Sequence, residues 1–294
     1  MAPFRIGKLF HLTPLVDDLV AAEAFFTGVF APLTFYRGYS SHWHRNASLM
    51  AVADAVIEPL QPLAPDGDGP GTSWYRYMAR FGPRVHNVAL YGTGLDELGR
   101  RLDEHGVRHT DAGVATTLFI HPKDSPGMIE FSDPGAFRGA DPRFSPHWDV
   151  FAADYWPNGH PLGLRHLSHT TIVVTDVEAA VRFYTDLLDA RTLPDQAGAE
   201  GGRSRFVVVG EGTVLELAQP AGPGRLADEL ARAGESVTGV TFRVGDAEAA
   251  ARHVEERVEM KVTLTDGRAA VDAASTWGCE YAFSDRALEG DPRG

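Results

Sequence analysis

The strongest constraint on this chain of 294 residues is that its two halves repeat one another. The segment from His11 to Phe26 aligns with the segment from His169 to Tyr184, and seven of the sixteen positions are identical. The same offset of 158 residues places the tetrapeptide Ile57–Leu60 over Leu215–Ala218. Two matches at one offset predict a duplicated domain.

Within each half, the pattern strand, helix, strands is predicted to occur twice. The stretch 9–16 is short and rich in apolar residues, and it ends beside Asp18, a residue type that caps helices. The residues that follow are apolar at three- and four-residue spacing, as one buried helical face requires. Asp176 takes the same place in the second half, and weaker copies begin at 86 and 237. The sequence therefore predicts an α+β fold built from four βαβββ modules.

The predicted division of the chain follows from these modules. Residues 1–133 form the first domain and residues 164–294 form the second. Residues 134–163 contain five prolines and no sustained period, which predicts a linker. Trp148, Tyr155 and Trp156 in this linker are expected to pack against one of the domains.

Composition narrows the classes of function. The formal charge is -13, with 40 acidic and 27 basic residues and no basic block, which disfavours binding to nucleic acid and to anionic membranes. A stretch long enough to span a membrane and a signal-peptide core are both missing, so a cytoplasmic location is expected. The single cysteine, Cys279, cannot form an internal disulfide. Any metal ion would need His, Asp, Glu or amide ligands.

Four βαβββ modules with His on a first strand and Glu on a last strand resemble the vicinal oxygen chelate superfamily, which contains glyoxalases and extradiol dioxygenases. This resemblance spans nearly the whole chain. It implies two tandem glyoxalase-like open barrels, each closed by two modules, with a divalent metal held inside. It also implies that His11, Glu58 and Glu130 occupy the first, second and fourth ligand positions. One divalent ion, Zn, Ni, Co, Mn or Fe, would suit such a donor set.

The third ligand position is less regular. In the family, a His directly precedes an apolar triplet, whereas here Val88–Leu90 is preceded by Asn87, and His86 lies one residue earlier. Because adjacent strand residues face opposite sides, His86 would need a bulge to reach the metal. We take His86 as the third ligand and keep Asn87 as the alternative.

The first half is most similar to methylmalonyl-CoA epimerase, through the predicted helix 74–81 and the segment from Phe119 to Phe131. The strand 47–52 lacks the Glu that such epimerases use as a base. His42, His44, or one of the carboxylates Glu58 and Glu130 would replace it. The resemblance implies an isomerase, epimerase or lyase that moves a proton next to a carbonyl through a metal-stabilised enolate.

The second half keeps His169 and Glu216 but carries Gly239 and Ala282 where the other two ligands are expected, with Glu280 displaced by two residues. A degenerate site is therefore expected there. Two other functions stay open: a ring-cleaving dioxygenase, and a protein that binds a drug or metabolite without catalysis. In each case the partner is a small molecule, and the chain is expected to be a monomer or a homodimer.

Overall fold

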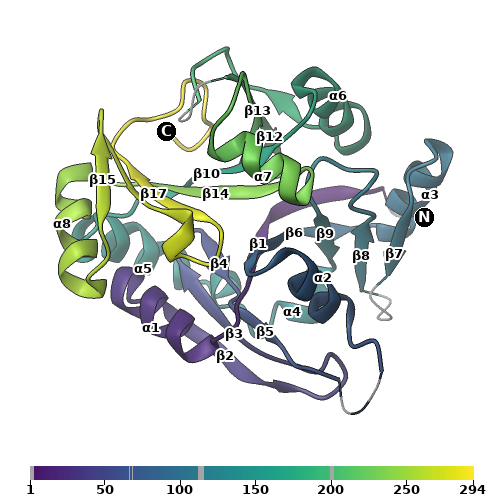
Figure 1. Cartoon of the computed structure of the whole chain (residues 1–294), viewed down its shortest axis with the longest axis horizontal. Helices are drawn as coiled ribbons and strands as arrows, with labels where there is room; N and C mark the ends of the chain where they lie inside the picture. Colours follow the sequence, from purple (N-terminus) through teal and green to yellow (C-terminus); the bar gives the residue numbers. More distant parts are fainter. Residues whose placement is uncertain (1–2, 66, 68, 112–115, 199–201) are drawn as a thin grey trace.

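The computed structural model describes residues 3–65, 67, 69–111, 116–198 and 202–294. These residues form two mixed β-sheets with helices packed against them, one sheet from each half of the chain (Figure 1). The α+β class predicted from the sequence is confirmed. Among the described residues, no helix combines the length and apolar character that a membrane span requires.

The first sheet runs in the order β2-β3-β4-β1-β6-β9-β8-β7, and β5 pairs with β1 and β3. Its strands are β1 (Arg5–Leu15), β2 (Leu33–Ser40), β3 (Arg45–Val52), β4 (Ala55–Ile57), β5 (Leu60–Pro62), β6 (Arg84–Thr93), β7 (His109–Asp111), β8 (Thr117–Ile120) and β9 (Ile129–Ser132). The helices of this half are α1 (Leu19–Phe30), α2 (Ser73–Phe81) and α3 (Leu95–Glu104).

The second sheet runs in the order β11-β12-β13-β10-β14-β17-β16-β15. Its strands are β10 (His166–Val173), β11 (Arg191–Thr192), β12 (Arg203–Val209), β13 (Thr213–Gln219), β14 (Ser236–Arg243), β15 (Val262–Thr265), β16 (Arg268–Val271) and β17 (Glu280–Ser284). The helical segments of this half are α6 (Val177–Leu188), α7 (Arg225–Ala233), α8 (Ala247–Val258) and the 3-10 turn η3 (Ala273–Ser275).

One pairing scheme occurs four times. In every module the first strand runs parallel to the last strand of the same module, as β1 with β4, β6 with β9, β10 with β13 and β14 with β17. In each half, the first strands of the two modules pair antiparallel, as β1 with β6 and β10 with β14. The four βαβββ modules and their tandem arrangement are thereby confirmed.

The predicted capping residues begin the helices as expected. The Asp18 carboxylate accepts the backbone N–H of Ala21, and Asp176 accepts those of Glu178 and Ala179. The chain from Ala55 to Pro62 forms two short strands, β4 and β5, with Glu58 and Pro59 between them. The break falls at Pro59, which has no N–H to donate to a sheet. Glu58 therefore lies at a bend, where its side chain can leave the sheet.

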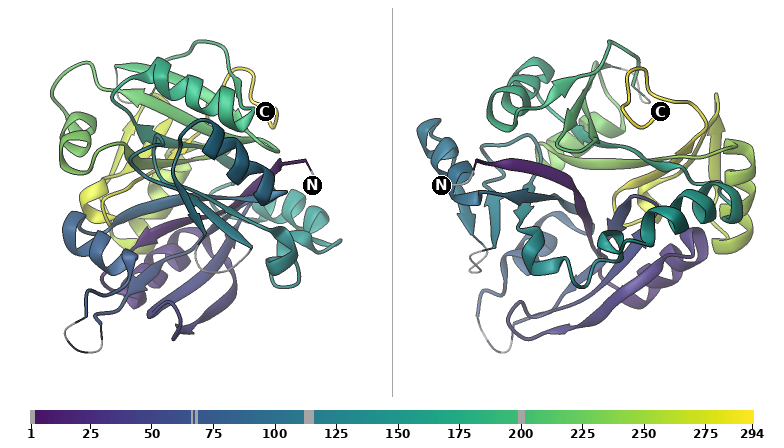
Figure 2. Two further views of the ribbon diagram at one scale, coloured as in Figure 1. Left: turned by 90° about the vertical axis from the view of Figure 1, so that its right-hand side faces the viewer. Right: turned by 180° about the vertical axis from the view of Figure 1, so that it is seen from behind.

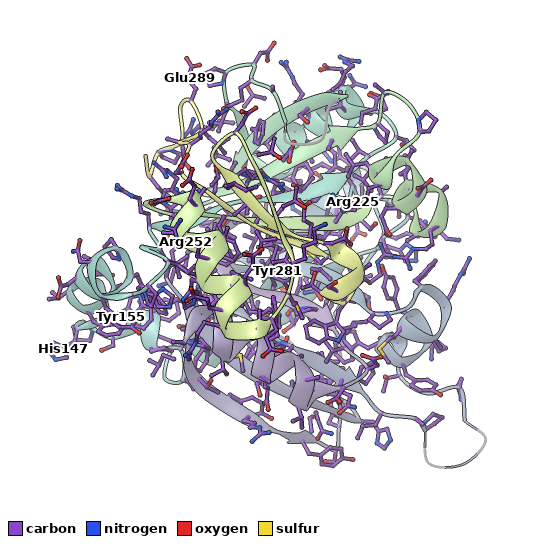
Figure 3. All side chains as sticks on the ribbon, turned by 60° about the vertical axis from the view of Figure 1, so that its left-hand side comes forward. His147, Tyr155, Arg225, Arg252, Tyr281 and Glu289 are labelled. Carbon is purple, nitrogen blue, oxygen red and sulfur yellow. The ribbon has the colours of Figure 1, made fainter. Side chains whose placement is uncertain are left out.

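Residues 134–163 contain more regular structure than a linker requires: α4 (Pro134–Phe137), the 3-10 turn η1 (Pro142–Phe144), α5 (Trp148–Asp154) and the π-helical turn η2 (Tyr155–Gly159). Trp148 and Trp156 are buried, so the expected packing of this segment is confirmed. Tyr155 is partly buried against the same core, and Figure 3 shows this segment with His147 and Tyr155 labelled.

The first helix of each half contacts the opposite half across one shared core. Helix α1 of the first half packs against α8 and the second sheet, where the ring centroids of Phe30 and Phe242 are 4.9 Å apart and those of Phe26 and Tyr281 are 5.5 Å apart. In return, the Tyr184 hydroxyl of α6 donates to a backbone carbonyl in the β8–β9 loop of the first half at 2.6 Å. The views in Figure 2 show α1 beside α8. Each half thus completes the packing of the other.

A buried arginine holds the first strand of the first half. Within the segment Asp141-Pro142-Arg143, the guanidinium of Arg143 donates from Nη1 to the carbonyl of Leu9 at 2.9 Å and from Nη2 to the carbonyl of Phe10 at 2.8 Å. Asp141 accepts from the same guanidinium at 2.6 Å. The pairing of β1 with β6 is irregular between Leu9 and His11, so the arginine satisfies carbonyls at an irregular point of the ladder.

The same tripeptide sequence recurs as Asp291-Pro292-Arg293, and its arginine binds the first strand of the second half in the same way. Arg293 donates to the carbonyls of Leu167 and Ser168, both at 2.8 Å. These two residues lie 158 positions after Leu9 and Phe10, which is the offset of the duplication. The ladder of β10 is irregular at the corresponding point, just before His169. The Asp-Pro-Arg clamp, meaning the tripeptides 141–143 and 291–293, therefore sets the local course of both first strands.

We predict that Arg143→Ala lowers the free energy of unfolding by about 3–5 kcal/mol, because it leaves the Asp141 charge and two strand carbonyls buried without a partner. Arg293→Ala should cost less, since the Arg293 side chain is 20% exposed and that of Arg143 is 1% exposed. Urea denaturation of both variants measures these changes.

Arg100→Ala is the matched control. Arg100 forms ion pairs within the exposed face of α3, and such pairs contribute less than about 1 kcal/mol. A loss for Arg143→Ala as small as that for Arg100→Ala would contradict a structural role of the clamp.

Candidate active site

Three residues that the sequence singled out meet at the centre of the first sheet. His11 on β1 pairs in register with Ala89 on β6, and Ala89 pairs with Glu130 on β9, so the three side chains point to one face. Glu58 reaches the same place from the bend between β4 and β5. His11 and Glu58 are each 5% exposed and Glu130 is 8% exposed. The strands thus bring one imidazole and two carboxylates into a largely buried cluster.

The histidine lies between the two carboxylates. Its Nδ1 is 3.3 Å from Glu58 Oε2 and 2.8 Å from the hydroxyl of Thr13, which also donates to Glu58 Oε2 at 3.2 Å. Its Nε2 points toward Glu130, with 3.9 Å to Oε1. The Ser132 hydroxyl donates to Glu130 Oε1 at 3.0 Å. The imidazole therefore lies between the two carboxylates, closer to Glu58 than to Glu130.

Arg45 belongs to this site, and sequence reasoning missed it. Its Nη1 donates to Glu58 Oε1 at 2.8 Å, and its guanidinium lies 5.0 Å from the centre of the Trp74 ring. A signal was present in the sequence, because Arg203 stands 158 residues later at the start of the matching strand β12. In the second half, however, Arg203 pairs with the exposed Glu178. Repetition alone therefore did not reveal the role of Arg45.

The structure places Asn87, and not His86, at the third position of the cluster. Asn87 Nδ2 donates to Glu130 Oε2 at 2.9 Å, whereas His86 lies on the opposite face of β6 against the ring of Tyr77, with ring centroids 4.7 Å apart. The pairing of β1 with β6 is irregular between Val85 and Val88, but this irregularity does not turn His86 toward the cluster. His86 still touches the site indirectly, because its Nδ1 is 2.8 Å from Asn87 Oδ1.

The other histidines considered as bases lie away from the cluster. His44 is in the turn between β2 and β3, where Nε2 contacts the Ala64 carbonyl and Nδ1 lies 3.3 Å from the Tyr39 hydroxyl. His42 is exposed in the same turn, with its ring against Trp43. The predicted catalytic role of His44 therefore has no geometric support.

The cluster opens into a cavity of about 320 Å³. The polar part of its lining consists of His11, Thr13, Arg45, Glu58, Asn87 and Glu130, together with Ser40 and Thr117. Much of the remaining lining is aromatic, from Phe10, Phe35, Tyr36, Trp43, Trp74, Phe119 and Phe137. A few polar groups at one end of an apolar cavity are typical of a site for a small molecule.

The environment moves the pKa values of the two carboxyl groups in opposite directions. Burial alone would raise the pKa of Glu58, but the charges of Arg45 and His11 and the hydrogen bonds from Arg45 and Thr13 lower it below its usual value. For Glu130, burial raises the pKa, and the nearby Glu58 carboxylate adds to this rise against the attraction of His11. The cluster therefore holds one firmly ionised carboxylate and one that binds a proton readily.

The second half shows what remains of the same arrangement. Thr171 donates to Glu216 at 2.7 Å, and His169 Nε2 is 3.6 Å from the same oxygen, as Thr13 and His11 contact Glu58. In the row of paired strands, however, Ala282 stands where Glu130 stands in the first half. Glu280 is bound instead by Arg268. The second carboxylate is therefore missing from this cluster.

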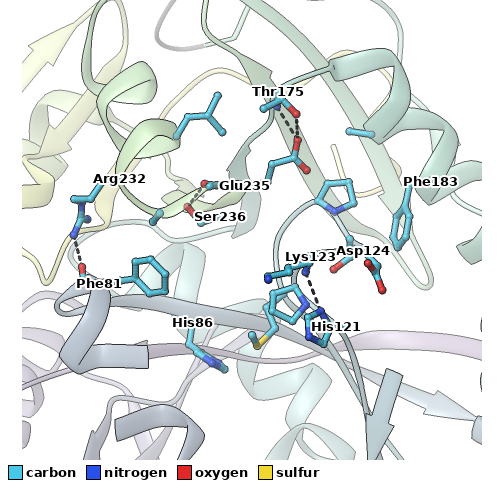
Figure 4. A pocket seen from close by; sticks show the side chains of 18 of the residues that line it. Phe81, His86, His121, Lys123, Asp124, Thr175, Phe183, Arg232, Glu235 and Ser236 are labelled. Atoms are coloured by element: carbon cyan, nitrogen blue, oxygen red, sulfur yellow. Dashed lines mark hydrogen bonds between the residues drawn. The ribbon is translucent and has the colours of Figure 1, made fainter. Parts of the chain in front are cut away.

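A larger cavity of about 930 Å³ lies between the two halves, on the far side of β6 (Figure 4). Phe81 and His86 line it from the first half, and Thr175 and Glu235 line it from the second. The buried carboxylates do not reach it. Size alone therefore does not identify the chemical centre, and we assign the candidate active site to the smaller cavity.

The carboxylate oxygens of the cluster already accept hydrogen bonds, and in this arrangement they do not fit a divalent metal ion. Arg45 and Thr13 donate to the two oxygens of Glu58, and Ser132 and Asn87 donate to the two oxygens of Glu130. A guanidinium cation 2.8 Å from a ligand oxygen also repels a second cation. Over the described residues, no group of three or more His, Cys, Asp or Glu side chains has the arrangement of a metal site. The predicted ligands His11, Glu58 and Glu130 thus meet, but as a hydrogen-bonded cluster.

Comparison with known families agrees with the fold. Residues 166–271 match the family model of the Glyoxalase/Bleomycin resistance protein/Dioxygenase superfamily. The resemblance to this superfamily that the sequence suggested is confirmed. A search of curated proteins found no match.

Solved structures resemble the whole chain at low identity. A triple mutant of 4-hydroxymandelate synthase from Streptomyces coelicolor is 14% identical, covers 97% of this chain and 95% of its own, and has a TM-score of 0.68. A fusion of a xylose isomerase-like TIM barrel with 4-hydroxyphenylpyruvate dioxygenase is 13% identical over 98% of this chain and 51% of its own, with a TM-score of 0.62.

Another solved structure matches only part of the chain. Methylmalonyl-CoA epimerase from Mycobacterium tuberculosis is 26% identical over 45% of this chain and 91% of its own, with a TM-score of 0.38.

The buried His86 predicts a pH dependence of stability. Burial lowers the pKa of His86 to about 4, so the folded protein keeps it neutral while the unfolded chain binds a proton near pH 6.5. The stabilisation is complete above pH 6.5 and is lost as the pH falls toward 4. His86→Gln should flatten this dependence by about 1.4 kcal/mol per pH unit within that window. Urea denaturation between pH 7 and 5 measures it, with the exposed His42→Gln as control. Equal slopes for wild type and His86→Gln would contradict the assignment.

Proposed function

Because residues 166–271 belong to the glyoxalase, bleomycin resistance protein and dioxygenase superfamily and the remaining modules repeat that fold, we propose that the chain is an enzyme of the vicinal oxygen chelate type. Its reaction is the transfer of a proton on a carbon next to a carbonyl group, as in an isomerase, an epimerase or a lyase. The observation that carries this proposal is the pair of buried carboxyl groups, Glu58 and Glu130, whose pKa values are moved apart across His11.

Glu130 is the proposed base. A general base works best when its pKa lies near the working pH, and burial moves the pKa of Glu130 upward in that direction. Asn87 and Ser132 each donate to one of its oxygens, which fixes the carboxylate in one orientation at the wall of the cavity. Lone pairs that these bonds leave free can then accept a proton from a substrate carbon.

Glu58, His11 and Arg45 form the electrostatic part of the proposed site. Glu58 stays ionised and holds both Arg45 and His11 in place. When a proton leaves the substrate carbon, negative charge develops on the carbonyl oxygen. The Arg45 guanidinium and the His11 ring are the donors that line the same cavity and can stabilise this charge.

The proposal includes the kind of substrate and the location that the sequence led us to expect. The substrate is a small molecule, since the cavity holds about 320 Å³, and the enzyme works in the cytoplasm. The second candidate is a protein that binds a planar molecule without converting it, and the largely aromatic lining favours it. A ring-cleaving dioxygenase has less support, because the likeness to dioxygenase structures concerns the fold alone.

We predict that the wild-type enzyme exchanges deuterium from D₂O into the α-carbon of at least one member of a panel of small 2-oxo acids, 3-oxo acids and thioesters. Glu130→Gln should slow this exchange about 100-fold or more, because the amide cannot accept the proton. The wild-type rate should rise with pH through the raised pKa of Glu130 and then level off, since only the ionised form is a base. Mass spectrometry of the substrate measures the exchange.

Glu104→Gln is the control for this experiment, because Glu104 lies exposed at the end of α3. Binding of a panel member without any exchange would favour the non-catalytic alternative. Exchange that survives in Glu130→Gln would exclude Glu130 as the base.

Metal dependence has a separate test. We expect wild-type protein that was treated with EDTA and dialysed against Zn²⁺, Mn²⁺, Co²⁺, Ni²⁺ or Fe²⁺ to retain much less than one equivalent, because Arg45 and Asn87 occupy the sites that a metal needs. The double variant Arg45→Gln/Asn87→His removes the cation and adds an imidazole, so it should bind a divalent ion at least tenfold more tightly. Elemental analysis measures both. One equivalent in wild type that is lost in His11→Ala/Glu130→Ala would restore the metal-dependent mechanism.

A further inference from the structure

We propose that the cavity of the first half takes an aromatic monocarboxylic acid, whose carboxylate binds Arg45 and whose ring lies among the aromatic side chains of the wall. This inference rests on the proposed function, because it names the substrate class of the same site. It begins from the way Arg45 is held.

The guanidinium of Arg45 has donors left over. A guanidinium carries five N–H groups, and among the described residues Arg45 uses Nη1 for Glu58. Its Nε is buried and has no hydrogen-bond partner among them. A buried N–H without a partner is costly. The side chain as a whole is 18% exposed and lines the cavity, so an acceptor inside the cavity can reach the accessible part of the guanidinium, although not the buried Nε.

The shape of the guanidinium selects the acceptor. A planar fork of N–H groups matches the two oxygens of a carboxylate, which makes a bidentate pair possible. Trp74 stacks below Arg45 and Glu58 fixes one of its terminal nitrogens, so the fork is already oriented. Glu58 already pairs with Arg45, so a doubly charged phosphate would add more unbalanced negative charge to the cavity than a carboxylate does. Of these two anions, the cavity therefore favours the singly charged carboxylate.

The walls select the remainder of the ligand. Trp43 and Trp74 meet edge to face with centroids 5.2 Å apart, and Phe10 and Phe137 form a second aromatic pair at 4.7 Å. Aromatic rings prefer such offset and edge contacts with another ring. A dry cavity of about 150 Å³ can hold benzene, so about 320 Å³ accommodates a ring with a short carboxylic arm.

Arg45 also explains why the cluster does not fit a divalent metal ion. In the arrangement expected from the sequence, a divalent cation would bind the substrate oxygens. Here a fixed guanidinium lies against Glu58 and supplies the positive charge at that end of the cavity. The substrate carboxylate takes the free side of this cation, and binding does not require a metal ion.

Phenylacetate is the probe, since it has a ring, a one-carbon arm and one carboxylate. Its binding to EDTA-treated wild-type protein is followed by quenching of the fluorescence of Trp43 and Trp74 and by calorimetry. We expect binding by the wild type, and at least tenfold weaker binding of phenylacetamide, which has the same shape without the charge. Cyclohexylacetate should also bind more weakly, because it keeps the charge and loses the aromatic contacts.

The variants isolate Arg45. The double variant Arg45→Gln/Glu58→Gln removes a cation and an anion together, so the charge balance is kept, and it should weaken phenylacetate at least tenfold while leaving phenylacetamide unchanged. Arg37→Gln is the matched control, because Arg37 lies on the neighbouring strand β2, pairs with Glu23 of α1 and does not line the cavity. Thermal melting checks that each variant is folded.

Three results would overturn the inference: no binding of phenylacetate to wild type, equal affinity for phenylacetamide, or binding that needs an added divalent ion. If the double variant does not fold, the comparison of the two ligands on wild type and on Trp74→Leu decides. Failure of the proposed function is seen separately. Arg45-dependent binding without any deuterium exchange would refute the proton transfer and leave the inference about the ligand standing. Exchange without Arg45-dependent binding would refute the inference about the ligand and leave the proton transfer standing.

Discussion

The geometry of the candidate site depends on the arginine of the Asp-Pro-Arg clamp. A ladder irregularity just before His11 leaves strand carbonyls that the neighbouring strand does not satisfy, and Arg143 binds two of them from the linker segment. The irregularity decides which face of β1 carries the imidazole, because each shift by one residue turns a side chain to the other face. Arg293 repeats this contact before His169, so the clamp was part of the unit that was duplicated. A residue far from His11 in the sequence thereby fixes the central side chain of the cavity.

A second constraint, the ion pair between Arg45 and Glu58, decides what the cluster can do. Two carboxylates and an imidazole at these distances would attract a divalent cation if the carboxylates were free. With Arg45 and Thr13 on Glu58, and Asn87 and Ser132 on Glu130, the oxygens already have donors. The same contacts separate the two carboxyl groups, because Arg45 favours the ionised form of Glu58 while burial favours the protonated form of Glu130. With Asn87 where the resemblance implied a histidine ligand, the cluster holds two carboxyl groups whose pKa values are moved apart.

The sequence predicted the features that follow from repeated or local patterns. It missed the contacts between side chains and backbone groups that lie far apart in the sequence. The repeat and local patterns predicted the four modules and the helix caps at Asp18 and Asp176. The resemblance to the superfamily predicted that His11, Glu58 and Glu130 meet. Strand alternation favoured Asn87 over His86, and the structure agrees with the alternation. The role of Arg45 was not predicted, because its partner Glu58 is thirteen residues away across a turn and no local pattern pairs them. The clamp was not predicted for the same reason, because Arg143 binds carbonyls more than 130 residues earlier.

The duplication also explains why one half could lose its second carboxylate without loss of the fold. Helices α1 and α6 each contact the opposite half, and residues of both halves share one core, so the second half contributes to the core of the first whatever its own cluster does. Ala282 at the position of Glu130 removes a buried charge, which lowers the cost of folding that half. His86 and Asn87 then lie back to back on β6, one facing the cavity between the halves and the other holding Glu130. Packing at the junction of the halves is therefore connected through two side chains to the proposed base, so a change at this junction can alter the orientation of Glu130 without touching the cavity that holds it.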